Sequence, residues 1–382
     1  MKVRVAFFAD ILIRDFDGAA RTMFQLIDRI PAAEFEFLFI CGTGPEKIGE
    51  FRCIQCPALQ IPGNKSYRMA FPRVKKRKIT AAVRVFDPHV VHIATPSFLG
   101  HFALDLAIRL NRPVLSIYHT HFKSYLPYYL KSFAVPPVRK LLVRLQNRFY
   151  NRCTRVYVPS ESLAAELRAD GLSPDHLQLW RRGIDKTLFT PEKRDRAFMN
   201  TLTGNDRPVI LFASRLVWEK NLQVLIALYD LIRERNLPYN LLITGDGVAA
   251  GKCRSEMPHA AFTGQADHQT LARIYASADV FFFPSVTETF GNVVLEAMAS
   301  GLPCVIADKG GSKDLIVPGR NGYLCAAGDA AAYLEKIEQI LRNPELKKKL
   351  SENAVADTAL LDWDYLAGIY FNDLKQMAFE NI

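Results

Sequence analysis

Residues 280–296 read VFFFPSVTETFGNVVLE and predict a strand, a turn and a helix in direct succession. The four apolar residues at 280–283 have the length and composition of a buried strand, and Pro284-Ser285 ends it. We expect a helix to start near Phe290. The first backbone N–H groups of a helix lack partners within it, so they would form an anion site suited to a diphosphate. Gly291 would let such a ligand approach the backbone closely.

Two glutamates flank this predicted helix start. Glu288 precedes the helix, and Glu296 lies about two turns into it. Each carboxylate could accept paired hydrogen bonds from the hydroxyls of a ribose or a hexose. The alternative is equally open: an acidic residue at a helix N-terminus and a solvated glutamate on the helix face.

Along the rest of the chain, short apolar runs alternate with longer helical patterns, as in parallel βαβ units whose strands are covered on both faces. The pattern restarts after the polar stretch 190–196, which opens with Thr190-Pro191. We therefore expect two α/β domains, at 1–190 and 191–362, followed by a helix over 363–382. The expected strands are 3–9, 36–41, 89–94, 113–118, 155–159, 208–213, 240–244, 279–283 and 303–307.

Ligands of open parallel sheets bind beyond the carboxyl ends of the strands, so we consider the residues that follow each run. Arg215 and Lys220 follow the strand at 208–213 and could neutralise a leaving diphosphate. Gly245, in Gly-Asp-Gly, makes a tight turn suited to a nucleotide. His119 follows the strand at 113–118 and could orient a sugar hydroxyl. The alternative for Arg215 and Lys220 is that both are ordinary surface residues. The alternative for His119 is a purely structural role.

The 382 residues carry a net charge of +10, which suits nucleic acid, an anionic membrane or an anionic small substrate. No base-reading module is recognised, which disfavours nucleic acid. No apolar run is long enough to span a bilayer and no signal peptide is recognised, so we expect a cytoplasmic protein with at most peripheral membrane contact.

A membrane contact is suggested by the basic run Arg73–Lys78 and by residues 138–152, where basic and apolar residues alternate at helical spacing after the aromatic stretch 125–129. The alternative is a helix packed on its own sheet with a solvated basic face.

Metal and redox motifs are weak. Cys53-Ile-Gln-Cys56 has the spacing of a zinc knuckle, but no second such pair exists, and ordinary thiols in a loop are the better interpretation. Two Asp-x-Asp triplets occur, at 15–17 and 362–364. Such a short pattern arises by chance, and Asp362 suits a helix N-cap. We expect no tightly held metal.

Together these segments resemble the retaining GT-B glycosyltransferases of family 4, nearest to the subgroup of glycolipid mannosyltransferases and sulfoquinovosyl-diacylglycerol synthases. The resemblance runs through nearly the whole chain. It rests on the order of several motifs: Asp17-Gly18, DPHVVH at 87–92, SIYHTH at 116–121, LWRRGID at 179–185, Ser214-Arg215, Lys220-Asn221, GDG at 245–247, YASAD at 275–279 and the block from Glu288 to Gly301.

The resemblance implies an α/β fold of two Rossmann-like, doubly wound parallel-sheet domains facing across a cleft. The first would bind the acceptor and the second the donor, a GDP- or UDP-linked hexose of the mannose or glucose type, with no cofactor. It further implies that the last helix crosses back to the first domain. Two departures, Ala19 and Val248, put recognition of the base in doubt.

The resemblance also implies roles for single residues. Arg215 and Lys220 would hold the diphosphate, Glu288 would contact the transferred sugar, and Glu296 the ribose. Backbone from Phe290 through Gly291 and Asn292 to Val293 would line the sugar and phosphates, with Gly245 beside the nucleotide. Gly18 and His119 would come from the acceptor domain. The acceptor would be a membrane lipid or glycolipid; a soluble acceptor, a sugar-nucleotide epimerase and a non-catalytic binding protein are the alternatives.

Overall fold

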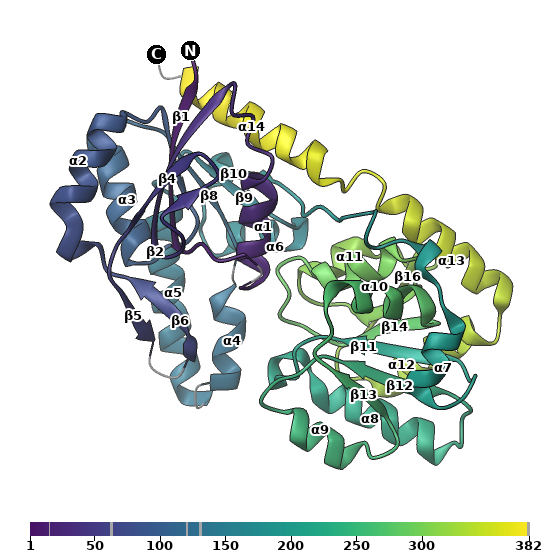
Figure 1. Cartoon of the computed structure of the whole chain (residues 1–382). Coiled ribbons are helices and arrows are strands. Elements are labelled where there is room, and N and C mark those ends of the chain that lie inside the picture. The colour runs from purple at the N-terminus through teal and green to yellow at the C-terminus, as the bar shows by residue number, and fades with distance from the viewer. Residues whose placement is uncertain (15, 62–63, 120, 130–131, 380–382) are drawn as a thin grey trace. The chain divides into compact units, whose positions relative to one another are not determined.

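The computed structural model describes residues 1–14, 16–61, 64–119, 121–129 and 132–379. The chain forms two compact units (Figure 1). The first unit contains Met1–Lys123, Lys131–Arg181 and Trp363–Ile382, and the second contains Ser124–Leu130 and Arg182–Asp362.

The first unit is built on an eight-stranded sheet in the order β10-β9-β8-β7-β1-β2-β4-β3, in which only β3 runs antiparallel to its neighbour. A separate hairpin consists of β5 and β6. The strands are β1 (Val3–Ile11), β2 (Phe35–Thr43), β3 (Lys47–Ile48), β4 (Phe51–Gln55), β5 (Ala58–Ile61), β6 (Asn64–Ala70), β7 (Val90–Ile93), β8 (Val114–Ile117), β9 (Arg155–Val158) and β10 (Leu177–Leu179).

Strand β1 shows why the sequence begins with a continuous apolar run. Val5 and Phe7 belong to one hydrophobic core, while Ala6 and Phe8 belong to a second. Successive side chains of a strand point to opposite faces, so both faces of this sheet are covered. The first core holds residues of α1 (Gly18–Ile27) and α14 (Trp363–Phe379), and the second holds residues of α2 (Lys76–Phe86), α3 (Phe98–Arg109), α5 (Val135–Tyr150) and α6 (Glu161–Ala169). Helix α4 (Phe122–Tyr129) precedes α5.

Helix α14 belongs to the first unit although it follows the whole second unit in sequence. Its buried face carries polar as well as apolar contacts. His92 Nδ1 lies 2.8 Å from the Tyr370 hydroxyl, and Trp180 Nε1 donates to the Leu366 carbonyl at 3.1 Å. Arg155 lies 2.8 Å from Asp373. These contacts fix the rotation of α14 on the sheet as well as its position.

The second unit contains a six-stranded, wholly parallel sheet in the order β13-β12-β11-β14-β15-β16. This is the order 3-2-1-4-5-6 of a doubly wound sheet, with the switch between β11 and β14. The strands are β11 (Val209–Ala213), β12 (Asn240–Thr244), β13 (Ala261–Gly264), β14 (Val280–Phe283), β15 (Cys304–Ala307) and β16 (Gly322–Cys325). The helices are α7 (Arg196–Thr203), α8 (Leu222–Glu234), α9 (Ala250–Glu256), α10 (His268–Ser277), α11 (Asn292–Ala299), α12 (Ala330–Leu341) and α13 (Pro344–Asp357).

The predicted domain boundary near residue 190 lies within the second unit, whose long segment begins at Arg182. The polar stretch after Thr190 is tied to the sheet through buried Asp279. Arg196 contacts Asp279 at 3.0 Å and Arg194 at 3.5 Å, while the Val209 N–H donates to it at 2.8 Å. Arg194 and Arg196, which resemble linker residues in the sequence, therefore pair with the Asp279 carboxylate of the second unit.

The sequence interpretation of the CxxC pair as loop thiols holds for Cys56, which lies in the connection after β4 (Phe51–Gln55), but not for Cys53. Cys53 lies on β4, and its sulfur is 3.3 Å from that of Cys41 on β2. Cys56 donates to the Cys41 carbonyl at 3.2 Å, and all seven cysteines are free thiols inside the protein. Burial raises the pKa of Cys56 to about 11. These thiols pack as small apolar side chains.

Candidate functional site

The switch point of the second sheet brings Lys220 and Glu288 together. Lys220 ends the 3₁₀ turn η5 (Trp218–Lys220) after β11, and Glu288 follows β14. The Lys220 ammonium pairs with Glu288 Oε1, and the side chains are only 8% and 17% exposed. Burial alone would raise the pKa of Glu288, but Lys220, Ser285 and Arg215 together hold it below its ordinary value. The carboxylate is therefore ionised.

Two further hydrogen bonds join the loops that carry this pair. Asn221 Nδ2 donates to the Pro284 carbonyl at 3.2 Å, and the Thr287 hydroxyl donates to the Glu219 carbonyl at 3.2 Å. A third loop, at the start of η6 (Gly311–Leu315), donates the Gly311 N–H to the Glu288 carbonyl at 2.7 Å. Glu288 is thus held by its backbone and by its side chain.

The Arg215 side chain is exposed, unlike that of Lys220, and its charge contributes to the lowered pKa of Glu288. Beside it lies the turn at Gly245. Gly245 has φ +129°, and a Cβ there would come within 1.9 Å of the Ser214 carbonyl oxygen. Only glycine fits this approach of β12 to the β11 loop. The turn therefore lies against the backbone that carries Arg215.

Helix α11 begins at Asn292, two residues later than predicted, because Gly291 takes a left-handed conformation with φ +91°. Gly291 is the N-cap, and no side chain caps α11 within the described chain. The N–H groups of Asn292 and Val293 belong to the uncapped first turn, and both residues are half-buried. Phe290 is buried, so it can contribute backbone but not a side chain to a ligand site.

Glu296 lies in the second turn of α11 and is not a solvated surface residue. It is only 8% exposed, and its Oε2 accepts from the Tyr275 hydroxyl at 3.3 Å. A glutamate is rarely buried on a helix unless a partner or a ligand binds its carboxylate. Tyr275 is one such partner of Glu296.

The first unit holds the two remaining predicted residues. Gly18 is exposed as the first residue of α1, which Asp17 caps by accepting from the Ala20 N–H at 2.7 Å. His119 follows β8 and is 9% exposed. The structure thus places Gly18 and His119 in one unit and all the other predicted site residues in the second.

The segment after His119 is fastened to α6. The Tyr118 hydroxyl lies 3.1 Å from His121 Nδ1, and His121 Nε2 lies 3.3 Å from Glu166. Lys123 also contacts Glu166, at 2.8 Å. The bond from His121, followed by that from Lys123, outweighs burial and lowers the pKa of Glu166 to about 2.

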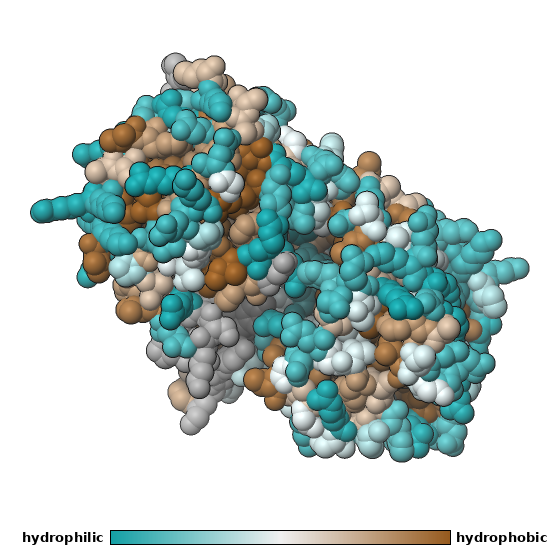
Figure 2. Space-filling model, viewed as in Figure 1, coloured by the Kyte–Doolittle hydropathy of each residue, from teal (hydrophilic) through white to brown (hydrophobic). Residues whose placement is uncertain are grey.

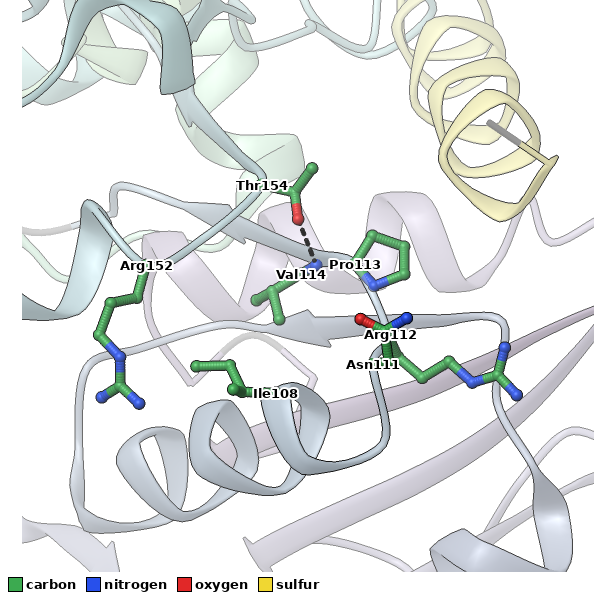
Figure 3. A pocket seen from close by; sticks show the side chains of 7 residues that line it. All are labelled: Ile108, Asn111, Arg112, Pro113, Val114, Arg152 and Thr154. Carbon is green, nitrogen blue, oxygen red and sulfur yellow. Dashed lines mark hydrogen bonds between the residues drawn. The ribbon is translucent and has the colours of Figure 1, made fainter. Parts of the chain in front are cut away.

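A hollow of about 220 Å³ in the first unit is lined by residues around Val114, the first residue of β8 (Figure 3). His119 follows the other end of that strand. Arg112 and Arg152 line the hollow, but they pair with Asp87 and Asp105 at 2.7 and 2.8 Å. The Val114 N–H donates to the Thr154 hydroxyl at 3.0 Å across its wall. It lies at the amino end of the strand, where ligands of parallel sheets rarely bind.

Neither Asp-x-Asp triplet forms a cluster in the described chain. Asp17 is a helix cap, Asp15 lies outside the described residues, and Asp364 pairs with Arg29. Over the described ranges, no group of three or more His, Cys, Asp or Glu side chains could hold a metal.

Sequence reasoning did not single out three groups around Glu288. Ser285 donates to its carboxylate at 2.9 Å, Thr287 fixes its loop, and the Gly310-Gly311 pair packs against its backbone. The Gly-Gly pair, three residues after the predicted strand at 303–307, is the one sequence signal for this contact. The serine is an ordinary turn residue and carries no signal of its own.

Models of known protein families match both halves of the chain. The family model for group 1 glycosyl transferases matches residues 193–357, and that for glycosyltransferase family 4 matches residues 16–188. The chain is 32% identical over 332 residues to a GDP-mannose-dependent alpha-mannosyltransferase of Mycolicibacterium smegmatis, with 84% of each chain covered. It is 30% identical over 334 residues to the protein of that name from Mycobacterium tuberculosis, with 86% of this chain and 85% of that protein covered.

A sulfoquinovosyl transferase of Arabidopsis thaliana is 32% identical over 296 residues, which cover 75% of this chain and 56% of that protein. Among solved structures, a sucrose-phosphate synthase from Thermosynechococcus elongatus superposes with a TM-score of 0.78 at 22% identity, with 100% of both chains covered. Such likeness to a solved structure concerns the fold: two parallel-sheet α/β domains of the GT-B type.

Proposed function

This chain belongs to glycosyltransferase family 4, and on that premise we propose that it transfers a hexose to a membrane lipid or glycolipid. The donor would be a GDP- or UDP-linked sugar of the mannose or glucose type, and the anomeric configuration would be retained. The second unit would bind the donor and the first unit the acceptor. The observation that carries the proposal is the buried Lys220–Glu288 pair beside exposed Arg215, at the switch point of the sheet.

The donor diphosphate suits the cations of this site. Arg215 and Lys220 would neutralise the charge that develops on the diphosphate as the glycosidic bond breaks. The uncapped N–H groups of α11 would donate hydrogen bonds to the remaining phosphate oxygens, because a helix N-terminus favours an anion. These groups can replace a metal ion in holding the leaving group. Glu296, buried beside Tyr275, would bind the ribose.

We assign none of the carboxylates in the described residues as a covalent nucleophile. We therefore propose that the acceptor hydroxyl attacks from the face on which the diphosphate leaves, through an oxocarbenium-like state. Glu288 would hold a hydroxyl of the hexose, and His119 would orient the sugar from the first unit. Positioning and charge stabilisation would then supply most of the rate enhancement.

A donor screen tests the proposal. Purified protein is offered GDP- and UDP-linked mannose and glucose with a lipid extract, and release of the nucleoside diphosphate is measured. We expect release from one donor class, abolished in Glu288→Ala. GDP-mannose is the first donor to test, because two relatives are named for it. Lack of release from every donor, or transfer only to water-soluble sugars, would contradict the proposed reaction or its acceptor.

The lipid acceptor is supported by helix α5 of the first unit. Its buried residues in the described chain, Gln146, Phe149 and Tyr150, lie in its last turns. Leu141 and Leu145 are 53% and 45% exposed. The basic residues Arg139, Lys140, Arg144 and Arg148 are exposed on the same helix. Exposed leucines among basic residues suit the interface of an anionic bilayer better than a purely solvated face.

The basic run Arg73–Lys78, which lies on and just before α2, also combines exposed basic residues with an exposed apolar one. Arg73, Lys76, Arg77 and Lys78 are exposed, and Val74 is 78% exposed. Where Figure 1 labels α2, Figure 2 shows hydrophilic side chains beside hydrophobic ones. Each basic residue near an anionic leaflet contributes about 1 kcal/mol, screened by salt. No helix in the described ranges is long and apolar enough to cross a bilayer.

Vesicle sedimentation tests the docking surface. We expect binding to anionic vesicles at low salt, weak binding to neutral ones, and loss of binding in the double variant Arg139→Glu/Arg144→Glu. The matched control is Lys348→Glu/Lys349→Glu on α13, where both lysines are exposed. Equal binding of wild-type protein to both vesicle types, or equal loss in the two double variants, would contradict docking through α5.

A further inference from the structure

Ser285 lies in the turn after β14 and is fully buried. Its hydroxyl donates to Glu288 Oε1 at 2.9 Å. Lys220 pairs with that same oxygen. Described residues make two hydrogen bonds to this carboxylate, and both are accepted by Oε1 rather than Oε2. The Glu288 side chain keeps 17% of its surface exposed.

Two donors on one oxygen constrain a carboxylate more than a single ion pair does. A lysine ammonium binds as a point charge and leaves the carboxylate free to rotate about its bond to the chain. A hydroxyl donating from a fixed turn removes that freedom. The turn is fixed, because the carbonyl of Pro284 accepts from Asn221 and the Thr287 hydroxyl donates to the Glu219 carbonyl.

We propose that Ser285 is a positioning residue for Glu288. Together with Lys220, its hydroxyl holds Oε1 and thereby presents Oε2 to a hydroxyl of the transferred hexose. Ser285 itself touches neither the sugar nor the diphosphate. This inference rests on the proposed donor site and adds the residue that orients its carboxylate.

The electrostatic surroundings of Glu288 give the inference a specific signature. The charged groups with the largest effect on the carboxylate are Lys220 and then Arg215, both after β11. The η6 loop contacts Glu288 through the Gly311 backbone N–H. Burial raises the pKa of Glu288, and the two cations and the Ser285 bond lower it. Without the serine hydroxyl the pKa must rise, since a hydrogen bond to the charged form is lost.

The experiment compares Ser285→Ala with Ser285→Thr, which keeps the hydroxyl. The matched control is Ser300→Ala, because Ser300 is buried in the same unit and its Oγ has no partner among the described residues. For Ser285→Ala we expect kcat/KM for the nucleotide sugar to fall about tenfold. The acid limb of its pH profile should move to higher pH. Affinity for the bare nucleoside diphosphate should stay near wild type, because that ligand lacks the hexose.

Threonine at 285 should restore most of kcat/KM, and the Ser300→Ala control should match wild type. A Ser285→Ala variant with an unshifted acid limb would overturn the inference. So would an equal loss of affinity for nucleotide sugar and nucleoside diphosphate, which indicates a general disturbance of the fold.

A titration by carbon NMR separates this inference from the proposed function. The Glu288 carboxyl signal is assigned by its loss in Glu288→Gln, and its titration midpoint is compared in wild type and Ser285→Ala. We expect a higher midpoint in the variant whether or not a donor has been found. An unchanged midpoint overturns the inference, while failure of the donor screen overturns only the proposed reaction.

Discussion

Lys220 and Glu288 come from loops after two adjacent strands, β11 and β14, and form an ion pair with little exposed surface. The pair lies in a single unit, so it does not depend on how the two units are arranged. A buried pair stabilises a protein only modestly, but removing one partner leaves an uncompensated charge. The two residues therefore cannot be substituted independently of one another.

Substitution of the cations should separate binding from stability. Arg215→Ala should lower turnover about a hundredfold with little change in thermal stability, because the side chain is exposed. Lys220→Ala should lower turnover as much and also destabilise the second unit, since Glu288 loses its partner. Steady-state kinetics and thermal melting check both, with Arg233→Ala on the exposed face of α8 as control. Near-normal turnover in both variants would remove the basis for the diphosphate site.

Asp279 should dominate the acid sensitivity of the second unit. Burial raises its pKa, but Lys347, Val209 N–H and Arg196 lower it below its ordinary value of 3.8. A carboxyl whose pKa is lowered by folding contributes stability above its unfolded pKa, and this is lost as pH falls through the folded value. Asp279→Asn should therefore cost about 3 kcal/mol near neutral pH. The difference from wild type should shrink as pH falls below 3.8. Melting curves of wild type and Asp279→Asn, measured across that pH range, test this prediction. A stability difference that stays constant with pH would argue against the ion pairs of Asp279.

The turn at Gly245 should tolerate no side chain. With φ +129° and a Cβ position 1.9 Å from the Ser214 carbonyl oxygen, Gly245→Ala must move the backbone that carries Arg215. We expect a loss of at least about 2 kcal/mol in stability and weaker donor binding. Gly251→Ala is the control, because a Cβ there meets no atom within 4 Å and the residue lies in α9. Equal melting of the two variants would contradict the close approach.

Activity should survive chelation. Two cations and an uncapped helix start can hold a diphosphate without a metal. Turnover is measured before and after EDTA treatment, with manganese restored in a third sample. Complete loss in EDTA that manganese reverses would show that a metal has a role after all.

The sequence predicts the central strands well and the edge strands poorly. Strands such as β1 and β11 are buried on both faces, so their residues form continuous apolar runs. Strand β13, at one edge of the second sheet, is only half-buried, and the strands of the β5–β6 hairpin mix polar and apolar residues. Without an apolar run, neither gives a strand signal.

The site is predictable where chemistry and strand ends coincide. Arg215, Lys220 and Glu288 are identifiable because charged residues follow buried strands. The burial of Glu296 cannot be predicted from the sequence, since its environment depends on Tyr275, which is 21 residues away. The sequence predicts the start of α11 two residues too early, because the left-handed conformation of Gly291 delays the helix and a glycine in sequence does not reveal its φ.

Helix α14 has a consequence for biosynthesis. It emerges from the ribosome after every residue of the second unit, so the six-stranded sheet can be complete while the first sheet still lacks one covering helix. Until then, the apolar face that Tyr370 and Leu374 will cover stays open to water. The nascent chain therefore keeps an aggregation-prone surface, and a need for chaperone protection, until residues 363–379 have been translated.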